Sequence, residues 1–348
     1  MIKKFQDTIA EEIEKLSVEL SLPPAELYDP IRYTLAMGGK RIRPLLVMMG
    51  CDLFGGKTDD AIAPALAVEL FHNFTLVHDD IMDNAPLRRN KVTVHSKWNT
   101  PTAILSGDVM MVKAYQLLCR SKLPPHVFDS VLSVFNDMAI KVCEGQQWDV
   151  NYEQLHRISI PQYFKMIELK TAVLLATCLK IGALIGGAGK EDAKNIYEFG
   201  KNTGIAFQLQ DDLLDVYGDE EKFGKQKGGD ILSNKKTFLL LKAMDIASSN
   251  QYLKEELEQW MTLPPTPELR SQPSLSARLS GERGAKDAAE KIEAVTRIYD
   301  FANIKKITEE EINSYHTKAV ESFEKVYVSA EKKKVLLDFT SMLLKREV

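Results

Sequence analysis

The chain has 348 residues, of which 45% are hydrophobic and 27% are charged, so it has the composition of a globular protein that is long enough to bury a large core. Its 45 Lys and Arg residues are balanced by 49 Asp and Glu residues, for a net charge of −4. This balance excludes the basic field expected of a nucleic-acid-binding protein or of a protein that binds an anionic membrane. Any phosphate chemistry must therefore depend on local basic residues or on metal ions.

The N-terminal segment MIKKFQDTIAEEIEKL is typical of an amphipathic, charged helix and lacks the apolar core of a signal peptide. Residues 171–189 are the one run that resembles a membrane span, but Lys180 and several glycines favour a buried helix. The four cysteines lie far apart and form no CxxC pair, so neither a zinc site nor a disulfide framework is indicated. We expect a cytoplasmic protein that is not an integral membrane protein.

Apolar residues recur at helical spacing along almost the whole chain, which predicts an all-α fold of about ten or more helices. Helix start signals include Asp59 and Asp60 before Pro64, and a capping box formed by Ser159 and Gln162. The predicted helices span residues 4–21, 27–38, 44–55, 60–83, 107–121, 126–151, 161–186, 190–217, 236–261 and 307–346.

One segment, 262–286, concentrates Pro, Ser, Gly and Arg and has almost no aromatic residue. This composition predicts a flexible insertion within a single domain that covers residues 1–348, with a boundary between two domains as the alternative.

Two acidic clusters, DDIMD at Asp79–Asp83 and DDLLD at Asp211–Asp215, repeat one pattern within apolar helices. The first and last aspartates of each cluster stand one helical turn apart on one face, whereas Asp80 points elsewhere. His72 and Thr75 continue this face in the first helix. A single cluster would indicate a solvated acidic surface, but two copies in helices that are apolar nearly all round favour a functional role.

Paired carboxylates on a buried helix face are costly unless cations lie beside them. Oxygen ligands without His or Cys partners suit Mg²⁺, which shares substrate phosphates rather than sitting in an all-protein cage. We therefore predict that Asp79, Asp83, Asp211 and Asp215 bind Mg²⁺.

Basic residues lie near both clusters and near a predicted helix N-terminus, where the helix dipole also favours anions. Each group alone would indicate a solvated surface, but their repeated position beside the aspartates favours a shared anion such as a diphosphate. These residues are Lys40, Arg41 and Arg43 in GGKRIRP, Arg88 and Arg89 after the first cluster, and Lys225 and Lys227 after the second.

In their order and spacing, these motifs resemble the trans-isoprenyl diphosphate synthase family, the polyprenyl synthetases of the farnesyl and geranylgeranyl type. The resemblance covers about Arg32 to Thr237 and is weak in the C-terminal third. The matching motifs are GGKRIRP, LVHDDIMDNAPLRR, Gly107-Asp108, Lys170-Thr171, FQLQDDLLD, Gly224-Lys225, and GGD followed by KKT. The resemblance implies an all-α bundle around a deep central cavity, with the aspartate motifs facing each other at its mouth, and a homodimer.

The resemblance also implies a reaction, in which isopentenyl diphosphate condenses with an allylic diphosphate by ionisation, condensation and elimination. Three Mg²⁺ ions per active site would be shared with the diphosphate. The implied metal ligands are Asp79, Asp83, Asp211 and Asp215.

The resemblance further implies that the allylic diphosphate is bound by Arg88, Lys170 and Lys225, and that isopentenyl diphosphate is bound by Lys40, Arg43, His72 and Arg89. Lys235 is implied as a further substrate contact. Thr171 and Gln208 are implied to stabilise the allylic cation, with a simple packing role as the alternative for each.

Product length depends, by the same resemblance, on residues four and five positions before the first aspartate, which here are Thr75 and Phe74. The small residue here is Thr75, nearer to Asp79, and the aromatic one is Phe74, one position further from Asp79. This arrangement favours geranylgeranyl diphosphate, with farnesyl diphosphate second and longer polyprenyl diphosphates third. Phe71, one turn earlier, is expected to contribute to the same stop. Because Phe74 lies about 140° from Asp79 around the helix, a purely structural role for Phe74 is the alternative.

Two other functions fit the sequence less well. A class I terpene cyclase would share the fold and the first motif, but DDLLD and GGKRIRP argue against it. A non-catalytic subunit of a prenyltransferase need not keep metal ligands, whereas this chain has all of them.

Overall fold

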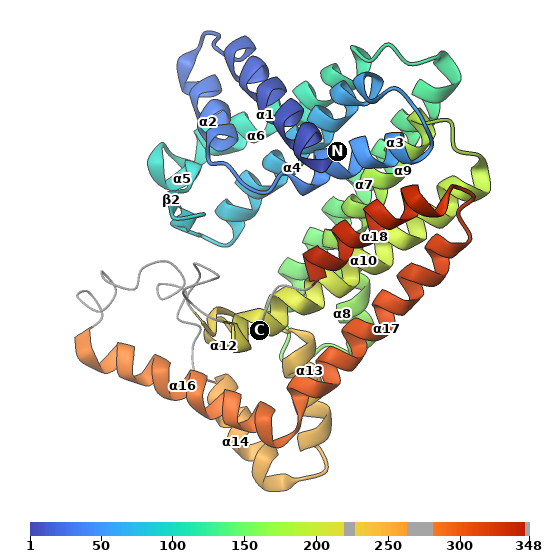
Figure 1. The fold of residues 1–348 in the computed structure, drawn as a ribbon. Coiled ribbons are helices and arrows are strands. Elements are labelled where there is room, and N and C mark those ends of the chain that lie inside the picture. The colour runs from blue at the N-terminus through green and yellow to red at the C-terminus, as the bar shows by residue number, and fades with distance from the viewer. Residues whose placement is uncertain (219–226, 263–280, 345–348) are drawn as a thin grey trace. The chain divides into compact units, whose positions relative to one another are not determined.

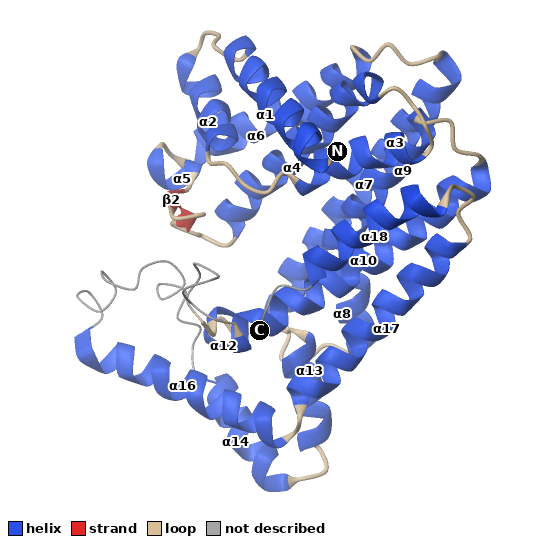
Figure 2. Cartoon of the chain, in the orientation of Figure 1, coloured by secondary structure: helices blue, strands red, loops and turns tan. Residues whose placement is uncertain are grey.

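The structure is a computed structural model that describes residues 1–218, 227–262 and 281–344. Figure 2 shows these residues as helices and connecting loops with one short hairpin, which confirms the all-α prediction. Within the described ranges, every helix falls short of the length or the hydropathy that a membrane-spanning helix needs.

The chain divides into two compact units, each assembled from segments that are distant in the sequence. Unit 1 consists of Met1–Ala139, Leu174–Glu198 and Ser322–Leu336. Unit 2 consists of the described residues of Ile140–Val173, Phe199–Glu321 and Leu337–Val348. The prediction of a single domain over residues 1–348 stays a prediction.

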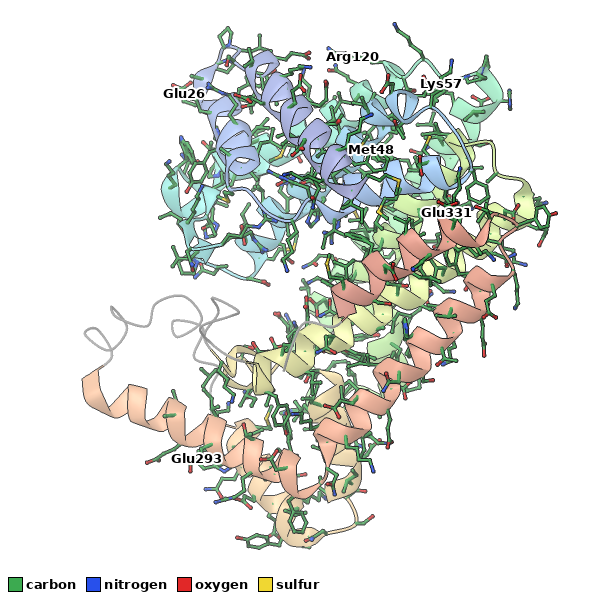
Figure 3. The ribbon with its side chains drawn as sticks, viewed as in Figure 1. Glu26, Met48, Lys57, Arg120, Glu293 and Glu331 are labelled. Carbon is green, nitrogen blue, oxygen red and sulfur yellow. The ribbon has the colours of Figure 1, made fainter. Side chains whose placement is uncertain are left out.

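Unit 1 is built around α4 (Ile62–Met82), which packs against α6 and α3 (Figure 1). In Figure 3, Met48 of α3 lies among the side chains of this unit, whereas Glu26 and Arg120 lie at its surface. The other elements are α1 (Ile2–Glu19), α2 (Ala25–Ala36), α3 (Ile42–Leu53), a 3-10 turn (Thr58–Ala61), β1 (Leu87–Arg88), β2 (Lys91–Val92), α5 (Val94–Lys97), α6 (Thr100–Cys119), α9 (Val173–Ile185), and parts of α7 (Pro125–Glu153), α10 (Lys190–Tyr217) and α18 (Ala330–Leu344).

Unit 2 has its own hydrophobic core, to which the later half of α10 contributes Leu209 and Leu213, both fully buried. Within this unit α14 packs against α13 and α16 (Figure 1). Its further elements are α8 (Ile160–Ile167), a π-helical turn (Glu168–Ala172), α12 (Gly229–Leu232), α13 (Phe238–Ala247), α14 (Gln251–Thr262), α16 (Gly281–Phe301) and most of α17 (Ile304–Glu324).

The structure corrects several predicted boundaries. The predicted helix 236–261 is two helices, α13 and α14, because the Ser-Ser-Asn sequence that separates them favours a turn. The predicted helix 307–346 is likewise divided into α17 and α18. Helix α16 is not among the predicted spans, although the helical pattern resumes after residue 286, and it begins earlier, including residues 281–286 of the segment assigned to an insertion. Residues 263–280 of that segment lie outside the described residues.

The predicted helix 161–186 begins, as expected, at a capping box in which Ser159 and Gln162 bond reciprocally. It is interrupted by the π-helical turn at Glu168–Ala172, which the periodicity did not predict. A Cβ atom at Gly145 would overlap the backbone nitrogen of Lys170, and one at Gly204 would lie 2.6 Å from the Cα atom of Ala172. Glycine on both flanking helices therefore lets the backbones approach this turn closely.

The short hairpin β1–β2 was also not predicted, since the chain has no Asn-Gly or Asp-Gly pair. Its two-residue turn is made by Arg89 and Asn90, which both have left-handed backbone angles, with φ of 53° and 59°. The side chain of Arg89 is thus held on a turn whose conformation is unfavourable for a long side chain.

Candidate active site

The first acidic motif lies at the C-terminal end of α4. Most residues of the preceding turns are buried, whereas Asp79 and Asp83 are partly exposed. Asp83 caps the helix, and its backbone nitrogen donates to the carbonyl of Asp79 over 2.9 Å. The predicted pair of carboxylates, one turn apart, is therefore present at the helix end.

The middle residue of this motif, Asp80, is 3% exposed and points into the protein, as the helical spacing predicted. Arg88 of β1 donates from Nε to Oδ1 of Asp80 over 2.7 Å and lies 3.4 Å from Oδ2 of Asp79. Burial raises the pKa of Asp80 to about 6, against the opposing effect of the Arg88 charge. Arg88, predicted as a diphosphate ligand, therefore already neutralises part of the acidic motif.

A buried histidine of α4 lies within the electrostatic influence of four arginines of unit 1. His72 is 9% exposed, and its pKa is held well below the usual value by burial first, and then by the charges of Arg43, Arg89, Arg88 and Arg41. The structure thus brings His72, Arg43 and Arg89 together, as the predicted isopentenyl diphosphate site requires. Because His72 is neutral, one of its nitrogens carries a proton that can be donated to an anion.

Lys40, the fourth predicted residue of that site, is exposed in the loop before α3. This loop has positive φ at Gly38 (78°), Gly39 (123°) and Arg41 (47°). The guanidinium of Arg89 donates to the carbonyl of Gly38, and a Cβ at Gly39 would lie 2.5 Å from Nη1 of Arg89. The two glycines therefore let the GGKRIRP loop close around the Arg89 side chain.

Sequence reasoning missed the partner of Arg41. Its guanidinium pairs with Glu69 of α4 and donates to the carbonyl of Leu35, and the two paired side chains are only 13% and 4% exposed. Asn73 supports the same carboxylate with a 3.1 Å hydrogen bond from Nδ2. The available signal was a single glutamate in the apolar run of α4, which requires a buried counter-charge.

The second acidic motif lies in the unit 2 part of α10. Asp211 and Asp215 are partly exposed, whereas Asp212 is 3% exposed. Oδ2 of Asp212 accepts from the hydroxyl of Tyr163 over 2.6 Å, and Oδ1 accepts from Nε2 of Gln208 over 2.9 Å. Burial raises the pKa of Asp212, and the charge of Lys235 opposes that shift. The two motifs therefore share one pattern, with a buried middle carboxylate and partly exposed outer carboxylates.

The GGD motif folds back on the end of the second acidic motif. The backbone nitrogen of Asp230 donates to Oδ2 of Asp215 over 2.9 Å. The backbone nitrogen of Gly228 donates to the carbonyl oxygen of Asp215 over 2.7 Å. Lys235 lies 3.5 Å from the carboxylate of Asp230. Lys235 is thus close to this motif, as the predicted substrate contact requires.

The predicted Lys170 and Thr171 both lie on the π-helical turn, a feature that often marks functional sites. Lys170 forms an ion pair with Asp149 of α7, which sequence reasoning did not identify. The hydroxyl of Thr171 donates to Oε1 of Gln208 over 3.1 Å, so these two predicted residues are in contact. Lys225 lies outside the described residues.

The residues predicted to limit product length lie on α4. Phe71 is fully buried and Phe74 is 8% exposed, with their rings edge to face at 5.4 Å. Phe71 also contacts the ring of Phe135 at 5.5 Å, and Phe74 contacts that of His78 at 4.8 Å. The hydroxyl of Thr75 donates to the carbonyl of His72. Phe74 is thus packed between aromatic neighbours of its own helix.

The described residues contain no cluster of three or more His, Cys, Asp or Glu side chains that would hold a metal by itself. The outer aspartates of both motifs are partly exposed carboxylates, and such oxygen donors suit Mg²⁺. Mg²⁺ often takes one or two protein carboxylates and completes its coordination with water and phosphate oxygens. The donor set therefore fits Mg²⁺ that is shared with a phosphorylated ligand.

Comparison with known proteins agrees with these features. A polyprenyl synthetase family model matches residues 24–263. The chain is 39% identical over 241 residues to the geranylgeranyl diphosphate synthase of Methanosarcina mazei, covering 68% of this chain and 74% of that protein. It is 37% identical over 248 residues to the short chain isoprenyl diphosphate synthase of Methanothermobacter thermautotrophicus, covering 71% and 75%.

Among solved structures, a crystal structure of a geranylgeranyl pyrophosphate synthase is similar with a TM-score of 0.88 at 41% identity, covering 100% of this chain and 99% of that one. The chain therefore belongs to the polyprenyl synthetase family, as its motifs indicated. It is an enzyme of the prenyltransferase class.

The buried Arg41–Glu69 pair generates a stability prediction. Glu69→Gln should lower the free energy of unfolding by about 3 kcal/mol, because Arg41 then keeps its charge without a counter-ion. Urea unfolding followed by circular dichroism measures this change. The control is Glu19→Gln, which breaks a pair with Arg120 whose side chains are both 59% exposed. A loss no larger than that of the control would contradict the importance of the buried pair.

Proposed function

We propose that the chain catalyses the Mg²⁺-dependent condensation of isopentenyl diphosphate with an allylic diphosphate, and that its main product is geranylgeranyl diphosphate. The observation that carries this proposal is the cluster of arginines around a buried, neutral His72, on the same helix as a partly exposed aspartate pair. Relatives named as geranylgeranyl diphosphate synthases support the product. Farnesyl diphosphate is the second candidate product and longer polyprenyl diphosphates are the third.

In unit 1, the basic cluster binds the diphosphate of isopentenyl diphosphate. Arg43 and Arg89 supply charge-assisted hydrogen bonds, the neutral His72 donates one more, and Lys40 reaches the anion from its exposed loop. Binding the diphosphate at these points positions the double bond for attack.

The outer aspartates Asp79, Asp83, Asp211 and Asp215 hold the metal, with three Mg²⁺ ions per active site. Bound Mg²⁺ neutralises charge on the allylic diphosphate and so makes it a better leaving group. Arg88, Lys170, Lys225 and Lys235 neutralise further diphosphate oxygens, and the first two do so as members of the ion pairs with Asp80 and Asp149.

The reaction then has three steps. The carbon–oxygen bond of the allylic substrate breaks, and its electron pair leaves with the diphosphate. The double bond of isopentenyl diphosphate attacks the resulting cation, which forms the new carbon–carbon bond. A proton is finally lost to the released diphosphate, which restores a double bond. Thr171 and Gln208 present oxygen atoms that stabilise the cation.

We also propose that the chain acts as a homodimer in the cytoplasm. Helix α6 exposes Leu105 (57%) and Val112 (54%), which lie two turns apart on one face and offer an apolar surface for a second copy. All four cysteines are free thiols in the structure, which suits a reducing compartment.

The direct test of the function is incubation with labelled isopentenyl diphosphate, an allylic primer and Mg²⁺. We expect labelled geranylgeranyl diphosphate as the main product, identified by chromatography after removal of the diphosphate. Activity should disappear when Mg²⁺ is removed by a chelator and return when it is added back. Absence of any labelled prenyl product would overturn the proposed function.

The metal assignment predicts that Asp79→Ala and Asp211→Ala each reduce turnover by about 10³-fold, since each removes a group that stabilises the departing diphosphate through Mg²⁺. Thermal stability should hold or rise, because like charges near Asp80 and Asp212 are removed. Initial rates at saturating Mg²⁺ measure the effect. Asp129→Ala, at an exposed position of α7, is the control. Near-normal turnover in either variant would refute the assignment.

The length assignment predicts that Phe74→Ala extends the product by about one or two isoprene units, because removing a ring opens space that an apolar chain can fill. Phe71→Ala should add to this effect. Product length is read by chromatography. Phe323→Ala, which truncates a 1% exposed ring elsewhere in unit 1, is the control and should not change product length. An unchanged product in both folded, active variants would place the stop elsewhere.

A further inference from the structure

A continuous chain of hydrogen bonds connects four side chains of unit 2. The hydroxyl of Tyr163 on α8 donates to Oδ2 of Asp212 over 2.6 Å. Nε2 of Gln208, one turn earlier on α10, donates to Oδ1 of the same carboxylate over 2.9 Å. Thr171, on the π-helical turn, donates from Oγ1 to Oε1 of Gln208 over 3.1 Å.

Burial decreases along this chain. Tyr163 is 1% exposed and Asp212 is 3% exposed, whereas Gln208 and Thr171 are partly exposed. The carboxylate is therefore at the buried end, and the two neutral groups are at the end that a ligand can reach. Asp212 is not among the outer aspartates proposed to bind Mg²⁺, so its role needs a separate explanation.

The carboxylate dictates which way the amide of Gln208 points. An ionised carboxylate only accepts hydrogen bonds, so Gln208 must present its NH₂ group to Asp212. The amide oxygen then points toward Thr171. Tyr163 occupies the other carboxylate oxygen, so Asp212 is held on both sides and cannot rotate away without losing a buried hydrogen bond.

The same chain aligns the dipoles of the two neutral groups. Gln208 directs its positive end to Asp212 and its negative end to Thr171, and Thr171 directs its hydroxyl hydrogen back to Gln208. Hydrogen bonds arranged head to tail polarise one another, and they do so more strongly where water is scarce. The amide oxygen keeps one lone pair and the hydroxyl oxygen keeps its own, and both are made more negative by the buried carboxylate.

We infer that Asp212 is a positioning residue for the condensation, which fixes the amide oxygen of Gln208 beside the Thr171 hydroxyl so that both oxygens face the positive charge of the allylic substrate. Tyr163 is the residue that holds Asp212 in place. This inference rests on the proposed function, because it assigns these oxygens to the allylic cation.

Substitution of Asp212 by Asn tests the orientation without changing the size of the side chain. An asparagine offers one acceptor and one donor, so it can bond to Gln208 in either amide orientation. In the flipped state the NH₂ group of Gln208, with its partial positive charge, replaces the oxygen. Tyr163→Phe leaves Asp212 as an acceptor and removes only its second support, so its effect should be smaller and of the same kind.

The experiment measures binding of two allylic diphosphate analogues by calorimetry in the presence of Mg²⁺. One carries an ammonium group in place of the reacting carbon, and the other is an uncharged analogue of the same shape. In Asp212→Asn, affinity for the ammonium analogue should fall about tenfold relative to the uncharged one, and kcat should fall by a similar factor at nearly constant KM. Tyr163→Phe should show the same selective loss at about threefold.

Tyr152→Phe is the matched control. Tyr152 is a 6% exposed tyrosine of the same core that stacks on Trp148, and the pKa of its hydroxyl is raised by burial alone. Removal of the hydroxyl in Tyr152→Phe should change the affinities for the two analogues equally or leave both unchanged.

The outcomes separate this inference from the proposed function. A parent enzyme that forms no prenyl product overturns the function and the inference together. An active parent whose Asp212→Asn variant loses affinity for both analogues equally, or for neither, overturns the inference alone. If Asp212→Asn does not fold, Tyr163→Phe decides, and an equal effect on both analogues again overturns it.

Discussion

Burial of the middle carboxylate in each acidic motif is the constraint on which the proposed site depends. Asp80 and Asp212 are both 3% exposed, and burial raises the pKa of each. Each buried carboxylate accepts hydrogen bonds that offset its loss of solvation. Asp80 accepts from Arg88, and Asp212 accepts from Tyr163 of another helix and from Gln208 of its own helix. Once the middle residue is anchored inward, the helix cannot rotate, and the outer aspartates, one turn apart, remain partly exposed.

The basic residues of unit 1 are also buried or crowded charges, but here the charges are positive. Burial is the largest cause of the lowered pKa of His72, and the charges of four arginines lower it further. The pKa of Arg89 is also lowered, mainly by burial and then by the charges of neighbouring arginines. Acidic partners offset part of this repulsion, with Glu69 pairing with Arg41 and Asp80 with Arg88. Several arginines held close together would suit a multiply charged anion, which is consistent with the proposed diphosphate site.

Local sequence signals predicted the helices well where the signals were strong. Residues 190–217 were predicted as a helix and form α10 with the same bounds, and the capping box at Ser159 is present. The π-helical turn at Glu168–Ala172 was missed because it has no signature in the apolar period and depends on how closely Gly145 and Gly204 let other helices approach. Helix α16 was missed because its first residues follow a Pro- and Ser-rich stretch that dominates the local composition.

The sequence by itself determined the all-α fold, the family, and the face of α4 on which Asp79 and Asp83 lie, because each of these depends on residue type and on spacing within one helix. Only the tertiary structure decided which partners the buried charges have. Arg41 and Glu69 are separated by 28 residues, and Tyr163 and Asp212 by 49. Periodicity shows that a side chain points inward but not which side chain it meets, since that depends on how helices distant in the sequence pack against one another.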